Sequence, residues 1–234
     1  MLNINCFNIE TIDDDTYCLF RNAISKERRR KADRFRFIND SKRCICAELL
    51  LRYSLFQALG RLDEPKIVYN EFGKPFVNHI AGFSYNLSHS GKWVVIAYGS
   101  TEIGIDIEEI QTVEENIYDK YFTEEEKNYI CTTTEAEHKK RFTQIWTLKE
   151  SYIKYLGTGI FTELHSFSVN AIEGVVRTQA EGIQKGLRLK SCLFDTDYYL
   201  SVCGMEEELS IREVSFEDFQ HILYVQKANV LVSF

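Results

Sequence analysis

Two long helical patterns in this chain end in the same way, and each is followed by strands. Residues 48–53 (ELLLRY) are similar to residues 150–155 (ESYIKY), and each helical pattern runs into Leu-Gly, at Gly60 and at Gly157. A supersecondary unit that occurs twice favours an α+β chain made of two similar halves related by a pseudo-twofold axis.

The length and composition are those of a globular protein. The chain has 234 residues, 44% of them hydrophobic and 27% charged, so it can bury a sizeable core. No apolar run approaches the roughly 20 residues that a membrane helix needs, and Met1 to Glu10 lacks the pattern of a signal peptide. Seven scattered cysteines without a CxxC pair favour the reducing cytoplasm over a disulfide framework or a zinc site.

The charge is unevenly distributed. Arg21 to Arg52 contains 11 Lys/Arg and 4 Asp/Glu, a balance of +7 in a chain whose net charge is -7. A basic island in an acidic protein indicates a bound anion. The alternative is a solvated helix face without a ligand.

Local patterns predict the main elements. Helices are expected from Ser25 to about Phe37, from Asp40 or Ser41 to near Gly60, over 135–156, and after Ser215. Strands are expected at 2–9, 66–69, 83–87, 93–98, 103–107, 167–170, 187–193 and 199–203, with turns at 89–91 and 99–101.

The segment 104–108 (GIDIE) places two acids together. On a strand, Ile103, Ile105 and Ile107 share one face, so Asp106 and Glu108 share the other. Adjacent carboxylates repel each other unless a cation lies between them, and Mg²⁺ binds through one or two carboxylates plus substrate phosphates. The alternative is a half-buried edge strand whose acids face water.

The helix at 146–154 (WTLKESYIK) contains a lysine within its apolar stripe. Lys149 either extends outward or meets a buried anion, because it has no evident partner in its own helix. Glu150 and Lys154 are four residues apart, a spacing that is also common for surface ion pairs.

Three further segments contain polar residues of interest. Asn86-Leu-Ser-His-Ser-Gly91 is typical of ligand-binding loops, although a lone histidine such as His89 is more often incidental. Thr123-Glu-Glu-Glu126 matches a capping box, which gives Glu126 a structural role. Cys44 lies on a core-like helix without a suitably spaced histidine, so we assign it no nucleophilic role.

Together these motifs resemble the surfactin-synthetase-activating type of 4′-phosphopantetheinyl transferase. The resemblance rests on residues 104–108, 122–126 (FTEEE) and 146–154, with 73–75 (GKP), 86–91 and the basic helix that begins at Ser25 upstream. It covers roughly residues 20 to 205, and the order and separations of the motifs make it specific.

The resemblance implies a fold and an activity. The fold would be a monomeric pseudo-dimer with an N-terminal half at 1–103 and a C-terminal half at 104–234, and coenzyme A would lie in the cleft between the halves. The enzyme would transfer phosphopantetheine from coenzyme A to a serine of a peptidyl or acyl carrier protein, with Mg²⁺, and release adenosine 3′,5′-bisphosphate. Carriers of nonribosomal peptide, polyketide or fatty-acid synthesis are possible acceptors.

The resemblance also implies roles for individual residues. Asp106, Glu108 and Glu150 would bind Mg²⁺, and Lys154 would contact the pyrophosphate. Glu150 or Glu126, or a metal-bound water, would take the proton of the serine, while His89 would offset charge on the leaving group. The remaining contacts to coenzyme A would come from Arg28, Lys31, Arg36, Lys74, Ser88 and His89.

The chain departs from the family pattern at two positions. Cys44 stands where a hydroxyl residue is common, and a thiol is a weaker hydrogen-bond partner. Arg28 stands where lysine is frequent, and arginine should preserve phosphate binding. For the carrier protein, we expect docking on the basic region and on an apolar patch at Ile117 to Phe122.

Two other functions remain as alternatives. A nucleic-acid-binding module would use the basic helix from Lys26 to Arg36, but only Phe35 and Phe37 could stack on bases, and the chain is acidic overall. A Mg²⁺-dependent phosphohydrolase could use the same three acids. We therefore expect no nucleic-acid partner and no membrane association.

Overall fold

The computed structural model describes residues 1–62, 64–78, 80–111 and 118–232. The strands are β1 (Leu2–Asn8), β2 (Ile67–Tyr69), β3 (Pro75–Val77), β4 (Ser84–Ser90), β5 (Trp93–Gly99), β6 (Gly104–Glu109), β7 (Phe167–Asn170), β8 (Val175–Thr178), β9 (Gly182–Ile183), β10 (Arg188–Phe194), β11 (Tyr198–Gly204) and β12 (Leu209–Glu213). The helices are α1 (Asp14–Ala23), α2 (Lys26–Ala32), α3 (Ile38–Leu59), α4 (Tyr118–Tyr121), α5 (Glu124–Cys131), α6 (Glu135–Leu156) and α7 (Phe216–Val232), with short 3-10 turns η1 (Ile9–Thr11), η3 (Gly159–Phe161) and η4 (Leu164–Ser166).

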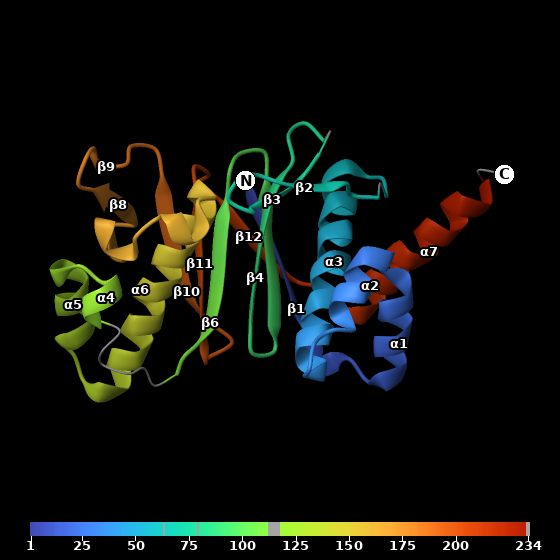
Figure 1. Cartoon of the computed structure of the whole chain (residues 1–234), viewed down its shortest axis with the longest axis horizontal. Helices are drawn as coiled ribbons and strands as arrows, with labels where there is room; N and C mark the ends of the chain where they lie inside the picture. The colour runs from blue at the N-terminus through green and yellow to red at the C-terminus, as the bar shows by residue number, and fades with distance from the viewer. Residues whose placement is uncertain (63, 79, 112–117, 233–234) are drawn as a thin grey trace.

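Two sheets lie at the centre of the molecule, and each carries one long helix on its outer face (Figure 1). The first sheet has the order β12-β1-β5-β4 and packs against α3, and the second has the order β10-β11-β6 and packs against α6. This arrangement confirms the predicted α+β fold. Among the described helices, none is long and apolar enough to cross a membrane.

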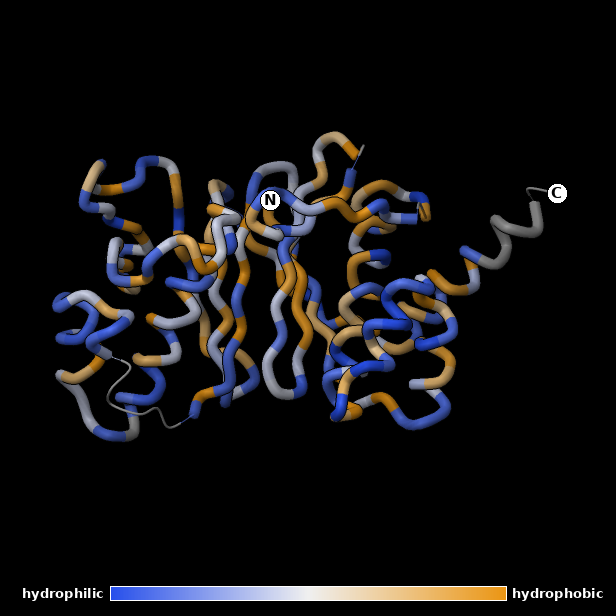
Figure 2. Tube along the Cα trace, in the orientation of Figure 1, coloured by the Kyte–Doolittle hydropathy of each residue, from blue (hydrophilic) through white to orange (hydrophobic). Residues whose placement is uncertain are grey.

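The core between the sheets follows from the alternation of side chains along each strand. Hydrophobic residues line the central strands (Figure 2), and one face of each sheet contributes to a shared buried cluster. Its members are Leu2, Ile4, Cys6, Trp93, Val95 and Ala97 from the first sheet and Ile103, Ile105, Ile107, Tyr198, Leu200 and Val202 from the second. Burying side chains of this size contributes about 1.5–3 kcal/mol each, so this cluster holds the halves together.

The two long helices end where expected, and α6 also begins where expected, whereas α3 begins at Ile38, before the expected Asp40 or Ser41. Both α3 and α6 stop at a glycine in the left-handed conformation, Gly60 at φ +68° and Gly157 at φ +69°. The predicted helix after Ser25 is shorter than expected, because α2 stops at Ala32 rather than at Phe37. The expected turn at 89–91 is also shorter: His89 and Ser90 are the last residues of β4, and only Gly91 and Lys92 connect it to β5.

Side chains of β4 join the two sheets at their neighbouring edges. Asn86 Oδ1 accepts a hydrogen bond from the Ile105 amide at 3.0 Å, and Ser90 Oγ accepts one from the Glu109 amide at 3.2 Å. Between them, Ser88 Oγ accepts from the Ile107 amide at 3.4 Å. Polar side chains thus satisfy the amides of β6, which would otherwise be an open edge. The acids of β6 are brought beside β4 as a consequence.

The C-terminal segment returns to the first half. β12 pairs in parallel with β1, and Phe219 of α7 packs against the rings of Phe7, Phe20 and Tyr53. The expected second half at 104–234 included this segment, whereas the structure packs it on the first sheet and α3. A parallel partner 207 residues away, as in the pairing of Leu2 with Leu209, leaves no local pattern in the sequence.

A buried ion pair anchors α5 to α6. Lys149 Nζ lies 2.8 Å from both Glu126 Oε1 and Oε2, and it also donates to the Phe167 carbonyl at 2.8 Å. Glu126 additionally accepts from the amides of Thr123 and Val169, each at 2.8 Å. The expected capping box is therefore present, and Lys149 meets a buried anion, the second of the two outcomes expected for it. Burial lowers the pKa of Lys149, and the Glu126 carboxylate opposes this shift.

Replacing Gly104 by alanine should destabilise the protein. A Cβ at this position would overlap the Ser151 carbonyl oxygen and the Tyr155 nitrogen of α6, both backbone atoms. Such overpacking costs about 1–3 kcal/mol, which urea unfolding would measure. Gly204→Ala is the matched control, because its Cβ would meet the Glu206 side chain at 3.4 Å and the Glu102 carbonyl oxygen at 3.8 Å, both without overlap. Equal stability of the two variants would contradict this account of β6 packing on α6.

Removing one partner of the Lys149–Glu126 pair should lower the free energy of unfolding more than removing both. Glu126→Gln leaves an ammonium buried with reduced compensation, and we expect a loss of about 3–5 kcal/mol in the free energy of unfolding. The double variant Glu126→Gln/Lys149→Met should recover part of that loss. A purely additive double variant in the same urea titration would show that the two side chains are not coupled.

Candidate functional site

A groove runs between the halves and widens into two chambers. The first chamber, about 650 Å³, is lined by α2, α3 and the strands β4 and β6. The second, about 670 Å³, is lined by the loop between β2 and β3, by α4 and by the end of α6. Glu150 and Lys154 of α6 line both chambers, so they lie where the two meet.

The acids of β6 lie in the first chamber. Asp106 is buried, and its Oδ1 accepts hydrogen bonds from Lys154 Nζ at 2.6 Å and from Ser88 Oγ at 2.8 Å. Lys154 also donates to Ser88 Oγ at 2.9 Å. The other oxygen, Asp106 Oδ2, has no hydrogen-bond partner among the described residues. The edge-strand alternative, with its acids facing water, is therefore wrong for Asp106.

The two neighbouring acids, Glu108 and Glu150, have raised pKa values. Ser90 Oγ donates to Glu108 Oε2 at 2.8 Å, yet burial, together with repulsion from Asp106, raises the pKa of Glu108 to about 7. The same two causes raise the pKa of Glu150, and the Lys154 ammonium partly opposes them. Each shift indicates negative charge that these side chains do not fully compensate.

These three acids could hold a divalent cation. An unpartnered buried oxygen and two carboxyls with raised pKa values fit a hard cation with oxygen ligands. Among the described residues, however, no group of three or more His, Cys, Asp or Glu side chains converges into a ready metal cage. Mg²⁺ does not require one, because it usually keeps water and takes substrate oxygens as further ligands.

The far wall of the first chamber is cationic. Arg28 and Lys31 of α2 and Arg43 of α3 supply its positive charge, and His89 of β4 lines it as well. Desolvation, followed by the nearby Arg43 guanidinium, lowers the pKa of His89. Arg43 donates hydrogen bonds to Asp40 and to the Gly91 carbonyl, and no motif in the sequence marks it as a site residue. Its only signal in the sequence is its position in the basic island between Arg21 and Arg52.

Four aromatic side chains also line the first chamber: Phe35, Tyr69, Tyr85 and Trp146. The sequence patterns singled out Phe35 only as a base-stacking candidate and Trp146 only as part of the motif at 146–154, and they marked neither Tyr69 nor Tyr85. Cys44 lines the same chamber and is buried.

Three of the expected site residues lie elsewhere. Arg36 lines neither chamber, and its guanidinium lies over the ring of the exposed Phe37, 5.3 Å from the centroid. Lys74 lines the second chamber, where its ammonium contacts Glu102 at 2.8 Å and the Tyr155 carbonyl at 3.1 Å. Glu126 lines neither chamber, and the Lys149 pair engages both of its oxygens.

Two of the three described aromatic residues in the expected docking patch at 117–122 are buried and not available to a partner. Phe122 is only 2% exposed and Tyr118 is buried, because both pack into the core beneath α6. Ile117 lies outside the described residues. Lys120 and Tyr121 are the members of this segment that line the groove.

Comparison with known proteins gives a consistent assignment over most of the chain. A family model described as the 4′-phosphopantetheinyl transferase superfamily matches residues 102–203, and one described as 4′-phosphopantetheinyl transferase, N-terminal, matches residues 12–101. The chain is 31% identical to the 4′-phosphopantetheinyl transferase Sfp of Bacillus subtilis over 204 residues, 85% of this chain and 91% of that one. It is 33% identical to psf-1 of Bacillus pumilus, over 77% and 78% of the two chains.

The two family models meet between residues 101 and 102, immediately before β6. The motifs, the two-sheet fold and the coverage of these relatives agree. The chain is a transferase that belongs to the 4′-phosphopantetheinyl transferase family and is of the Sfp type.

Proposed function

We propose that this enzyme transfers 4′-phosphopantetheine from coenzyme A to a serine hydroxyl of a peptidyl or acyl carrier protein, with Mg²⁺, and releases adenosine 3′,5′-bisphosphate. The observation that carries the proposal is the position of Asp106. Its unpartnered oxygen and the Lys154 ammonium lie where the cationic chamber meets the second chamber.

The cationic chamber suits the nucleotide end of coenzyme A. Lys31 forms no ion pair among the described residues, so its ammonium is available to a phosphate. Arg28 has one long ion pair, with 3.6 Å between its Nε and Glu48 Oε2. Arg43 and His89 line the same wall. Arginine can bind phosphate oxygens through two parallel hydrogen bonds.

Asp106, Glu108 and Glu150 are the side chains that would hold Mg²⁺. When bound, the ion would neutralise charge on the pyrophosphate and orient it. Without the ion, the Lys154 ammonium compensates the negative charge of Asp106, with 2.6 Å between Nζ and Oδ1. Ser88 and Ser90 fix the rotamers of Asp106 and Glu108 through their hydroxyl groups.

The reaction is a displacement at phosphorus. A bond forms between the serine oxygen and the β-phosphorus, and the bond from that phosphorus to the oxygen of the nucleotide breaks. Glu150 lies where the two chambers meet, so in this proposal it accepts the serine proton, directly or through water. Lys154 and His89 stabilise the charge that develops on the leaving oxygens. In this proposal Glu126 only positions α6, because both its oxygens bind Lys149.

Three of our expectations stay predictions: a monomeric state, a cytoplasmic location and the absence of a nucleic-acid partner. The phosphohydrolase alternative is tested by the first experiment below.

The first test is the mass of an apo carrier protein after incubation with this enzyme, coenzyme A and Mg²⁺. We expect a gain equal to one phosphopantetheinyl group, which EDTA should prevent. A panel of peptidyl and acyl carriers would rank the acceptors. Release of nucleotide without modification of any carrier would instead support the phosphohydrolase.

Glu150→Gln should abolish transfer while carrier binding survives. The amide is nearly isosteric, but it can neither accept the proton nor neutralise a cation. Transfer is followed by carrier mass, and carrier binding is followed by calorimetry. Normal turnover by this variant would remove Glu150 from the mechanism.

Substitution of the cationic wall should weaken coenzyme A binding selectively. Lys31→Ala and Arg43→Ala each remove a charged donor worth about 1.5–3 kcal/mol, so the KM for coenzyme A should rise about ten- to a hundredfold. Arg30→Ala, on the exposed side of the same helix as Lys31, is the control. Arg36→Ala tests the basic residue that the resemblance assigns to coenzyme A although it lines neither chamber. A larger effect at Arg30 than at Lys31 would refute this location for the phosphates.

A further inference from the structure

The second chamber differs from the first in its chemistry. Its wall is largely apolar, with contributions from Ile153, Leu164 and Tyr121, yet it opens onto Glu150 and Lys154. Its cations are mostly engaged, since Lys74 is bound to Glu102 and Lys154 to Asp106. The chamber is therefore poorly suited to phosphate groups.

The geometry of the reaction requires a separate entrance for the acceptor. Attacking and leaving oxygens lie roughly in line on opposite sides of the phosphorus. If the nucleotide leaves toward the cationic chamber, then the serine must approach from the other side of Glu150. The second chamber lies on that side of the junction.

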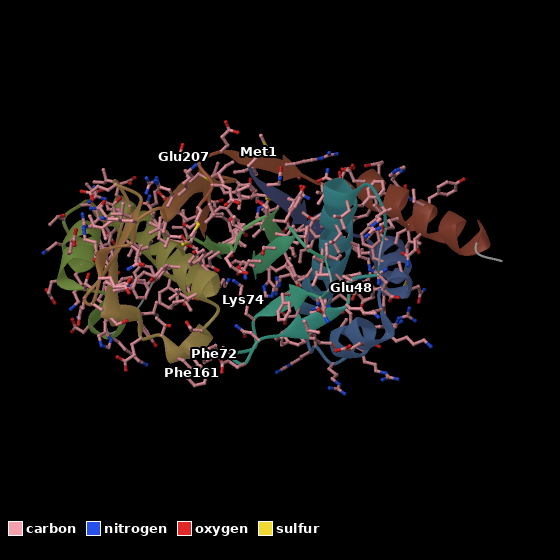
Figure 3. All side chains as sticks on the ribbon, turned by 90° about the horizontal axis from the view of Figure 1, so that it is seen from above. Met1, Glu48, Phe72, Lys74, Phe161 and Glu207 are labelled. Carbon is pink, nitrogen blue, oxygen red and sulfur yellow. The ribbon has the colours of Figure 1, made fainter. Side chains whose placement is uncertain are left out.

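The rim of this chamber exposes large apolar side chains from both halves. Ile160 is 95% exposed and Phe161 is 71% exposed, both on η3, and Phe72 in the loop between β2 and β3 is 40% exposed. The rings of Phe72 and Phe161 lie side by side (Figure 3), with centroids 5.3 Å apart. Contiguous exposed apolar groups beside a cleft are typical of protein-binding sites.

The rim is held in place by contacts between the halves. Asn70 Nδ2 donates to the Gly157 carbonyl at 3.0 Å, and Lys74 Nζ donates to the Tyr155 carbonyl at 3.1 Å. Both bonds tie the β2–β3 loop to the end of α6. A surface that is already ordered loses little entropy on binding a partner.

One cation at this rim is positioned for an acidic partner. The Lys120 ammonium lies 5.0 Å from the centroid of the Tyr121 ring and forms no ion pair among the described residues. A carboxylate of a docked protein could therefore pair with Lys120. The chain itself carries a net charge of -7, so attraction would have to be local.

We propose that the rim formed by Phe72, Ile160 and Phe161, with Lys120, is the docking surface for the acceptor protein. The occupant is the serine-bearing segment of the carrier, which presents an apolar face with a flanking acid and inserts its serine into the second chamber. This inference rests on the proposed function. The pantetheine arm of coenzyme A is the competing occupant.

The test compares Ile160→Asp with Ile172→Asp. Ile172 is also a highly exposed isoleucine, at 84%, but lines neither chamber, so it controls for adding a surface charge. We expect Ile160→Asp to raise the KM for the apo carrier at least about tenfold, and to weaken binding of a carrier whose acceptor serine is replaced by alanine. The KM for coenzyme A should not change, and Ile172→Asp should behave as wild type.

Each other result overturns a particular claim. Unchanged carrier binding by Ile160→Asp refutes the docking surface even if the wild type transfers normally. Weaker binding of coenzyme A, with unchanged binding of adenosine 3′,5′-bisphosphate, assigns the chamber to the pantetheine arm instead. If the wild type binds carrier and Ile160→Asp does not, but neither modifies it, the docking surface stands and the proposed function fails.

Discussion

The site depends on how two sheet edges meet. β4 and β6 are edge strands of different sheets, and they are joined by side chains of β4 rather than by a backbone ladder. Ser88 does both tasks: its oxygen accepts from the Ile107 amide and its hydroxyl donates to Asp106. The bonds that close the seam between the halves therefore also orient the acid at the junction of the chambers.

The internal repeat shows one pattern used for two purposes. In α3, Glu48 and Arg52 pair at 2.5 Å, and Glu48 also accepts from the Ser25 amide and hydroxyl, which anchors the start of α2. In α6, the corresponding Glu150 and Lys154 line the groove, and Lys154 donates a hydrogen bond to Asp106 on β6. The first pair is an ion pair within its own helix, whereas in the second Lys154 contacts Asp106 of the neighbouring strand and Glu150 lines both chambers.

Charge and apolar surface divide the groove into two parts. Positive charge collects where α2 and α3 face β4, while the chamber beyond Glu150 is largely apolar and exposes aromatic rings at its rim. Such a division suits two substrates that meet at one phosphorus atom, because each chamber favours a different kind of group. The buried Lys149–Glu126 pair holds the α6 side of this junction without taking part in either chamber.

Much of this could be predicted from the sequence, because local patterns encode it. The alternation of Ile103, Ile105 and Ile107 predicted the buried face of β6, the capping box predicted the start of α5, and the terminal glycines predicted the ends of α3 and α6.

Only the tertiary structure decided which charged side chains remain available to a ligand. Lys74 and Arg36 are basic residues like Lys31, but one is bound to carbonyl groups and the other lies over an exposed ring. The return of β12 to β1, the place of Arg43 in the cationic wall and the meeting of Phe72 with Phe161 each join segments that are distant along the chain. Sequence periodicity reports which face of an element is buried, but it does not report which other element covers that face.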